Sequence, residues 1–525
     1  MAKTKSSAPT VTAQDRYETL KSERQPYEAR ARAAAELTIP ALFPPEGTTG
    51  ATELPKPWQS IGARGVNHLS AKLLLALFPP NQPFFRLTME EYVKDELAAQ
   101  TGEAYGEAQV AFEQALRRVE QTVITRLEHT GARTTLNEVF KQLINAGNAL
   151  VEVMEDSRIR LHLLTNYVVK RDKAGNVIEI VVLETVSRMA LPPEVLPLLE
   201  KSDAEQKDES HENNVEIYTR ISLVDGAWEV HQEVGGELIP GSEGTYPKDK
   251  SPWMPLRFIK VDGEDYGRGM VDEYLGDLKT LEALQKAIVQ FAGAAAKIIV
   301  FVDDTGLTDG NEVADADSGD VLDGRAEDVS AFQLDKYYDF RVAKEVLDDT
   351  RARLEEAFLL FSGMRRDAER VTAEEIRAII NELEQGLGGI YSILTQELQA
   401  PLVRRVIHQM VKEKALPQLP DEAIAPQIIT GVQALGRQSE AVRLQRWLIG
   451  VAETFGPEVV AKHVRVDGFL RLKAIADGID PEVVLRDAKE VAQMEEAQAQ
   501  QAALQKLGPQ AMKLGAEQGG GQSGA

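Results

Sequence analysis

The sequence predicts a mainly α-helical protein with a β-rich insertion, an α+β fold class. Apolar residues recur every three or four positions through much of 15–150 and 267–413, which is the spacing of amphipathic helices. Over about 151–262 the pattern changes to the alternation typical of half-buried strands. Hydrophobic residues make up 43% of the 525 residues, so the chain can build a sizeable core.

The first 150 residues are expected to be helical. Residues 17–31 carry apolar side chains at helical spacing, and prolines from position 40 end that helix. A compact apolar helix is expected over 66–78, followed by helices at about 90–129 and 134–148.

The insertion is expected to hold two β-hairpins. Residues 158–163 alternate between polar and apolar, as a half-buried strand does. The segment 173–176 and the pair Asp225–Gly226 have the composition of hairpin turns, each between two runs rich in β-branched residues. The charged stretch 200–214 is expected to be an exposed loop.

After the insertion we expect a helix, a short mixed segment and a second helix. Residues 271–291 keep helical spacing, 298–302 have the pattern of a strand, and 303–323 form an acidic loop. The second helix is expected over 342–361. The apolar run 287–302 is shorter than the about 20 residues that cross a bilayer, so we interpret it as a buried helix leading into a strand and expect no membrane contact.

A long helix is expected from Thr372, which with Glu375 forms a capping box. Apolar residues continue at helical spacing as far as Leu402. Glycines inside a helix favour a kink, and three lie in this run: Gly386, Gly388 and Gly389. Short helices are expected over 431–495, before a flexible Gln- and Gly-rich end.

The sequence contains no recognisable catalytic motif. It has no cysteine and no P-loop, dinucleotide-binding, nucleophile-elbow or H-E-x-x-H pattern, and its seven histidines never pair at i, i+2 or i, i+4. The acidic run 315–320 lacks the glycine position and glutamate of a calcium loop, and 62–65 is interpreted as a turn rather than a phosphate seat. We therefore expect no catalytic residue, no cofactor and no metal.

The charge balance argues against a chain that grips nucleic acid over its whole surface. Lys and Arg number 59 against 83 Asp and Glu, a net charge of −24. Arg365, Arg366 and Arg370 form a short basic stretch between two helices. It is either a solvated loop or a loop that touches a polyanion with point charges, and it has no aromatic side chains to stack bases. Composition and spacing favour a structural or assembly protein.

Six blocks, in order through most of the chain, resemble the portal (head-to-tail connector) proteins of podovirus-type, autographivirus-like short-tailed bacteriophages. The blocks are TIPALFP (38–44), PWQSIGARGVNHLSAKLLLALFP (57–79), NYVVKRDKAGNV (166–177), DGEDYGRGMVDEYLGDLKTLEALQKAIV (262–289), GRAEDVSAFQLDKYYDF (324–340) and ERVTAEEIRAIINELEQGLGGIYSILTQELQAPLVRRV (369–406).

This resemblance implies a dodecameric ring at one capsid vertex, in which each subunit has a wing, stem, clip and crown. By analogy the parts are a flexible N-terminus (1–14), the wing (15–266, helical over 15–150 and β-hairpin over 151–262), stem helices (267–297 and 341–361), the clip (298–340), a tunnel loop (362–371), a long kinked helix at the wing and crown base (372–415), the crown (416–495) and a flexible tail (496–525).

The resemblance also implies a function without enzymatic activity. The ring would conduct double-stranded DNA during packaging and ejection, nucleate procapsid assembly, and dock the terminase large subunit and then the tail adaptor. Further implied partners are the major capsid, scaffolding and internal core proteins. The implied location is the virion and, during assembly, the host cytoplasm. Arg365, Arg366 and Arg370 would line the channel. The alternatives are a minor virion or scaffolding protein without a DNA channel, and an enzyme whose site is assembled from distant carboxylates.

Overall fold

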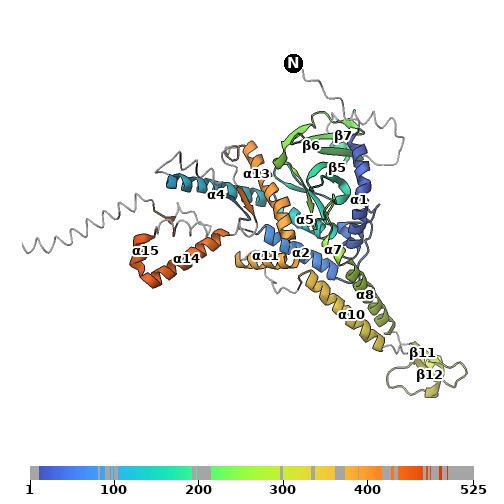
Figure 1. Cartoon of the computed structure of the whole chain (residues 1–525). Coiled ribbons are helices and arrows are strands. Elements are labelled where there is room, and N and C mark those ends of the chain that lie inside the picture. Colours follow the sequence, from blue (N-terminus) through green and yellow to red (C-terminus); the bar gives the residue numbers. More distant parts are fainter. Residues whose placement is uncertain are drawn as a thin grey trace, which may run out of the picture. The chain divides into compact units, whose positions relative to one another are not determined.

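The computed structural model describes residues 11–80, 83–88, 105–191, 214–295, 299–332, 337–360, 373–387, 389–416, 427–430 and 436–464, with isolated residues besides. The chain divides into two compact units, Met1–Ala434 and Leu435–Ala525. The predicted α+β class is confirmed, because helices combine with several antiparallel sheets (Figure 1).

The largest sheet has six antiparallel strands in the order β4-β5-β6-β7-β8, with β9 also paired to β7. Both predicted hairpins are confirmed, as β4–β5 and β6–β7. Asp225 (φ 49°) and Gly226 (φ 82°) both have positive φ, as a tight hairpin turn between twisted strands requires. The strands are β4 (Tyr167–Arg171), β5 (Val177–Ser187), β6 (Asn214–Val224), β7 (Ala227–Val234), β8 (Glu237–Leu238) and β9 (Gly244–Pro247).

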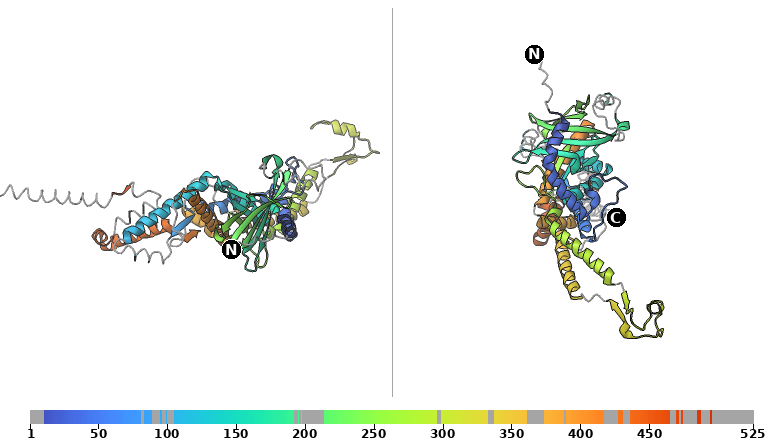
Figure 2. Two further views of the ribbon diagram at one scale, coloured as in Figure 1. Left: turned by 90° about the horizontal axis from the view of Figure 1, so that it is seen from above. Right: turned by 90° about the vertical axis from the view of Figure 1, so that its right-hand side faces the viewer.

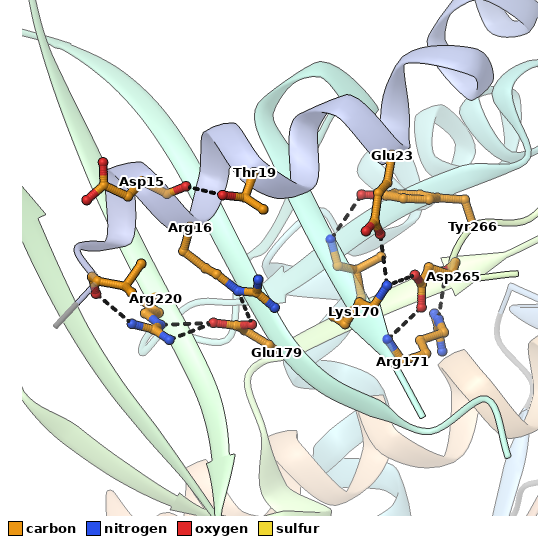
Figure 3. A network of polar contacts seen from close by, with 12 residues as sticks. Asp15, Arg16, Thr19, Glu23, Lys170, Arg171, Glu179, Arg220, Asp265 and Tyr266 are labelled. Atoms are coloured by element: carbon orange, nitrogen blue, oxygen red, sulfur yellow. Dashed lines mark hydrogen bonds and ion pairs between the residues drawn. The ribbon is translucent and has the colours of Figure 1, made fainter. Parts of the chain in front are cut away.

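Helix α1 (Ala13–Glu36) is fixed to this sheet by ion pairs (Figure 3). Arg16 of α1 and Arg220 of β6 converge on Glu179 of β5, with N···O distances of 2.7 and 2.9 Å. Further along the helix, Lys170 lies between Glu23 and Asp265, at 2.9 and 3.0 Å. These charge-assisted contacts set the position of α1 along the strands.

The main core lies between this sheet, α1 and a second sheet of order β10-β2-β3. Its buried side chains include Leu150, Tyr167, Ile180, Ile221, Trp228 and Tyr266. The remaining elements around it are α2 (Ile61–Leu77), α4 (Tyr105–His129), α5 (Ala132–Ala146), β2 (Asn148–Val153), β3 (Ile159–His162), β10 (Trp253–Arg257), α7 (Met270–Glu273), and the short turns η1 (Pro40–Leu42), η3 (Leu164–Asn166), η4 (Arg188–Ala190) and η5 (Lys248–Lys250).

One strand lies within the region expected to be helical. β1 (Phe85–Thr88) pairs in antiparallel fashion with β13 (Gln427–Thr430), from the far end of the first unit. Helix α4 packs beside it, and Glu120 of α4 accepts a hydrogen bond from the Leu87 amide at 2.7 Å. The prediction failed here because a pairing partner more than 300 residues away leaves no local signal.

Residues 275–357 form an arm, and we call the rest of the first unit the body. In Figure 2, α8 (Leu275–Ala295) and α10 (Tyr337–Ala357) run side by side and end in a two-stranded sheet. That sheet pairs β11 (Ile299–Val302) with β12 (Val329–Phe332), and the expected acidic loop between them includes the short helix α9 (Gly310–Asp315) and the turn η6 (Ala326–Asp328).

The interpretation of 287–302 as buried is wrong for the single chain. Helices α8 and α10 contact each other, and the arm buries Leu278, Leu281, Leu347 and Leu354. Other apolar side chains of the arm are exposed, including Val289, Ile299, Val300, Phe301, Val342 and Val346. None of the described helices is both long enough and apolar enough to span a membrane.

Where one long helix was expected from residue 372, the structure has four segments: α11 (Ala373–Leu387), α12 (Ile390–Leu394), the π-helical turn η8 (Thr395–Gln399) and α13 (Ala400–Lys412). The second unit contains α14 (Gly436–Phe455) and α15 (Pro457–His463). At 20 residues, α14 is longer than the short helices expected there.

Candidate functional site

The three arginines singled out in the sequence, Arg365, Arg366 and Arg370, lie outside the described residues. The structure does describe both sides of their segment. Helix α10 ends at Ala357 and leads to Leu359, and α11 begins at Ala373. We call the end of α10 and its contacts the loop base, because they fix where the arginine segment leaves the body.

The loop base is held by two polar side chains from α2. The Leu359 carbonyl accepts hydrogen bonds from Lys72 Nζ and His68 Nε2, each at 3.1 Å. Lys72 Nζ also contacts Glu382 of α11 at 2.9 Å, and the Lys72 side chain is only 7% exposed. A buried ammonium needs such partners, so Lys72 ties together α2, the end of α10 and α11.

Close packing reinforces the same point. Phe358 is fully buried, and its ring lies directly on Gly65 of α2. A Cβ atom at Gly65 would collide with that ring, so only glycine allows this approach. Leu359 has a φ of +53°, a conformation that side chains with a Cβ seldom adopt. The chain therefore turns sharply at Leu359, where the contacts of Phe358 with Gly65 and of the Leu359 carbonyl with α2 hold the backbone in place.

Burial, followed by the charge of Lys72, lowers the pKa of His68 from its usual value. The imidazole is then neutral at pH 7, with its Nε2–H directed at the Leu359 carbonyl. Two cations side by side would repel each other, so a neutral His68 is compatible with the Lys72 ammonium.

The helix that follows the arginine segment is interrupted at the predicted glycines. α11 ends at Leu387, and Gly389 has a φ of +90° immediately before α12. Gly388 lies outside the described residues. Gly386 lies against Leu359, where an added Cβ would come within 3.1 Å of a Leu359 methyl carbon. The assignment of all three glycines to a helix kink stays a prediction.

A buried ion pair fixes the π-helical turn η8 to the body. Glu397 of η8 contacts Arg257 of β10 at 3.1 Å, and the Arg257 side chain is 2% exposed. Burial and the nearby Arg257 charge lower the pKa of Arg171 to about 10. Arg171 Nη2 in turn donates to the Pro255 carbonyl at 2.8 Å. Two buried cations therefore depend on Glu397 and on backbone carbonyls.

The tip of the arm is acidic and stabilised by its own carboxylates. Asp328 Oδ2 accepts hydrogen bonds from the Leu307 amide and the Thr308 hydroxyl, both at 3.0 Å. Asp303 N donates to the Asp328 carbonyl at 2.8 Å. Val321 is 96% exposed. The tip therefore presents both carboxylates and bare apolar groups to solvent.

Residues 10–485 match the family described as bacteriophage head to tail connecting protein. The portal protein of Escherichia phage T7 is 40% identical over 514 residues, which covers 96% of this chain and 91% of the relative. The chain belongs to the head-to-tail connecting protein family. The resemblance drawn from the six sequence blocks is thereby confirmed.

Other connector-family relatives agree. The portal protein of Enterobacteria phage T3 is 44% identical over 82% of this chain and 80% of the relative. That of Enterobacteria phage SP6 is 30% identical over 93% of each. Among solved structures, a chain from the neck of an empty gene transfer agent particle overlaps with a TM-score of 0.37 and 10% identity, over 74% of this chain and 86% of that chain.

Among the residues that the structure describes, no group of three or more His, Asp or Glu side chains is placed to hold a metal ion. Sequence reasoning missed Lys72, His68 and Glu382 as parts of the connector's loop base. A lysine inside the apolar run 66–78 was the available signal, since a charged side chain in such a helix must find a partner. Its partners are about 290 and 310 residues away, so the sequence could not name them.

Proposed function

We propose that this connector-family chain is a portal subunit, which forms a dodecameric ring at one capsid vertex and conducts double-stranded DNA during packaging and ejection. The observation that carries the proposal is the match to the T7 portal protein along 96% of the chain. The ring would also nucleate procapsid assembly. No catalytic residue and no cofactor are part of this proposal.

The exposed apolar residues of the arm support the proposal that the chain forms a ring. The arm helices α8 and α10 contact each other, and apolar residues such as Val289 of α8 and Val342 of α10 remain exposed. Contiguous exposed apolar surface favours association, and head-to-tail contacts close into a ring when the rotation per subunit permits. We assign α8 and α10 to the stem and 298–340 to the clip.

The net negative charge of the chain supports a channel through which DNA slides, rather than a site that binds DNA tightly. Twelve chains of −24 carry on the order of −290 formal charges. DNA carries about one charge per 1.7 Å of axis, so a largely acidic wall repels the duplex and lets it slide. Arg365, Arg366 and Arg370 in the tunnel loop 362–371 would supply sparse contacts at the narrowest point, held in place by the loop base.

The clip, with the acidic arm tip, would dock the terminase large subunit and later the tail adaptor. The wing (15–266), the kinked helix (372–415) and the crown (416–495) would face the major capsid, scaffolding and internal core proteins. The subunit would reside in the virion and, during assembly, in the host cytoplasm.

Negative-stain electron microscopy with native mass on the same sample tests the ring. We expect rings with a central hole, at a mass near twelve times 57.8 kDa. Poreless particles would instead favour a minor virion or scaffolding protein without a DNA channel.

Replacement of Arg365, Arg366 and Arg370 by alanine tests the channel contact. We expect rings to form normally and DNA retention in filled heads to fall. Arg351→Ala, at an exposed position of the arm, is a control for the loss of one positive charge outside this segment. Normal packaging and retention in the triple variant would contradict a role for these arginines in the channel.

A further inference from the structure

A polar cavity of about 500 Å³ lies between helix α13 and strand β9, apart from the loop base. This volume falls within the about 300–1,000 Å³ typical of binding pockets. Arg405, Gln409 and Lys412 of α13 line one side, and Tyr246 of β9 and Glu155 line the other. Nothing in the proposed portal function accounts for this cavity.

Arg405 is the central feature of the cavity. It is 5% exposed, and its guanidinium lies 5.1 Å from the centre of the Tyr246 ring. Within the described part of the chain it makes no hydrogen bond and no ion pair, and its buried Nε lacks a partner. Burial lowers the pKa of Arg405 from its usual value. A buried cation without an anionic partner is costly, and none of the described residues supplies that partner.

A second unsatisfied group lies one helical turn further on. Gln409 Nε2 donates to the Met154 carbonyl at 2.6 Å, which leaves its Oε1 as an acceptor. That Oε1 is buried and has no partner. Positions 405 and 409 are neighbours on the helix surface. The cavity wall therefore presents an unpaired donor group next to an unpaired acceptor.

The carboxylates nearby do not complete the site. Glu413 is paired with Arg126 of α4. Glu155 is an exposed residue that acts on Arg405 only at longer range and forms no ion pair with it. Lys412, also exposed, adds a second positive charge at the cavity wall.

We propose that the cavity receives an acidic side chain from a second copy of this chain. Its carboxylate would bind the Arg405 guanidinium, and a backbone N–H of the same segment would donate to Gln409 Oε1. An acidic residue in a polypeptide supplies both groups together, whereas a fully deprotonated anion such as sulfate has only acceptors to offer. This inference rests on the proposed function, because it requires copies of the chain to associate.

Charge complementarity favours a second copy as the source. Each chain carries 83 acidic residues and a net charge of −24, so two copies repel each other in general and both display many carboxylates. A buried arginine at their contact would form an ion pair with one such carboxylate, and this pair would fix the register of the two copies.

Zero-length cross-linking on assembled full-length protein tests this. Chains labelled with ¹⁴N and ¹⁵N are mixed before assembly and treated with a carbodiimide, which joins a lysine amine to a carboxylate in contact with it. We expect peptides in which Lys412 is linked to an Asp or Glu of the other isotope label. Such a mixed-label link can arise only between two copies.

Arg405→Met should lower the yield of that Lys412 link at least fivefold, while Arg404→Met should leave it unchanged. Arg404 is the adjacent exposed residue, and it loses the same charge outside the cavity. The wild-type result alone decides the matter if Arg405→Met does not fold. Rings without a mixed-label link at Lys412, or with a link only to Glu155 of the same chain, would overturn the inference and leave the portal proposal standing. Absence of rings would count against both.

Discussion

Helix α5 in the body and helix α10 in the arm both carry apolar side chains, but they bury these side chains to different extents. Leu136, Val139 and Leu143 of α5 are essentially inaccessible to solvent, because other elements of the same chain surround that helix. On α10, Leu354 is buried against its neighbours while Val342 is 60% exposed. The body completes its own core, and the arm leaves part of its apolar surface for another molecule.

The polar contacts differ in the same way. In the body, Glu397 neutralises the buried Arg257, and Lys72 is enclosed at the loop base. In the arm, Arg353 of α10 and Asp277 of α8 form a pair at 3.2 Å, with side chains that are 58% and 36% exposed. A buried pair stabilises only while both partners are present, whereas an exposed pair contributes little. The following predictions test this contrast, from the largest expected effect to the smallest.

The largest effect is expected for the buried ion pair. Glu397→Gln leaves Arg257 charged and buried, and it should lower the free energy of unfolding by about 3–5 kcal/mol. Asp277→Asn in the arm removes a carboxylate from the exposed pair with Arg353 and should lower it by no more than about 1 kcal/mol. Urea unfolding at equal protein concentration measures both. Equal losses would show that the two regions do not differ in this respect.

Truncation of a buried apolar side chain in the arm should lower the stability of the chain, whereas truncation of an exposed one should mainly weaken ring formation. Leu278→Ala empties a fully buried position and should cost about 2–5 kcal/mol. Val342→Ala alters an exposed position and should change unfolding by no more than about 0.5 kcal/mol, yet it should weaken ring formation in native mass spectra. If Val342→Ala destabilised the chain as much as Leu278→Ala, the arm would be packed against its own chain.

Replacement by alanine should change the free energy of unfolding in opposite directions at two helical glycines. Gly65→Ala pushes a methyl group into the Phe358 ring and should cost about 1–3 kcal/mol. Gly293→Ala in α8 meets open space and should gain up to about 1 kcal/mol, because alanine is the better helix former. Thermal unfolding of the two variants checks this. A stabilised Gly65→Ala chain would contradict the close contact at the loop base.

The smallest effect concerns pH. Because the pKa of His68 is lowered in the folded chain, the unfolded state binds its proton first as pH falls. The contribution of His68 to stability is therefore complete above its ordinary pKa of about 6.5 and declines as pH falls below it. His68→Gln should flatten the fall in melting temperature between pH 7 and pH 5. Parallel curves for variant and wild type would contradict this.

Many elements of the body and of the arm could be predicted from local sequence signals. The two hairpins follow from turn residues such as Gly226 between β-branched runs, and α8 follows from its apolar spacing. The pairing of β1 with β13 and the partners of Lys72 could not, because each depends on residues about 290 or more positions away.

Two further differences have physical reasons. The run from Ala373 to Lys412 keeps helical apolar spacing throughout, and that spacing does not reveal the positive φ of Gly389 or the π-helical turn before Pro401. An apolar run also does not tell which molecule covers it. That is why the sequence predicts a buried segment at 287–302, although Val289, Ile299, Val300 and Phe301 are exposed in the single chain.

The most direct test of the account asks whether the exposed face of the arm becomes covered on assembly. The chain has no natural cysteine, so Val300→Cys and Val342→Cys each introduce a single thiol. Ala51→Cys, at an exposed position of the body, is the control. Maleimide should react at least tenfold more slowly with the two arm thiols in assembled protein than in dissociated protein, and equally fast in both states with the control. Unchanged reactivity at both arm positions would contradict the claim that this face joins neighbouring subunits.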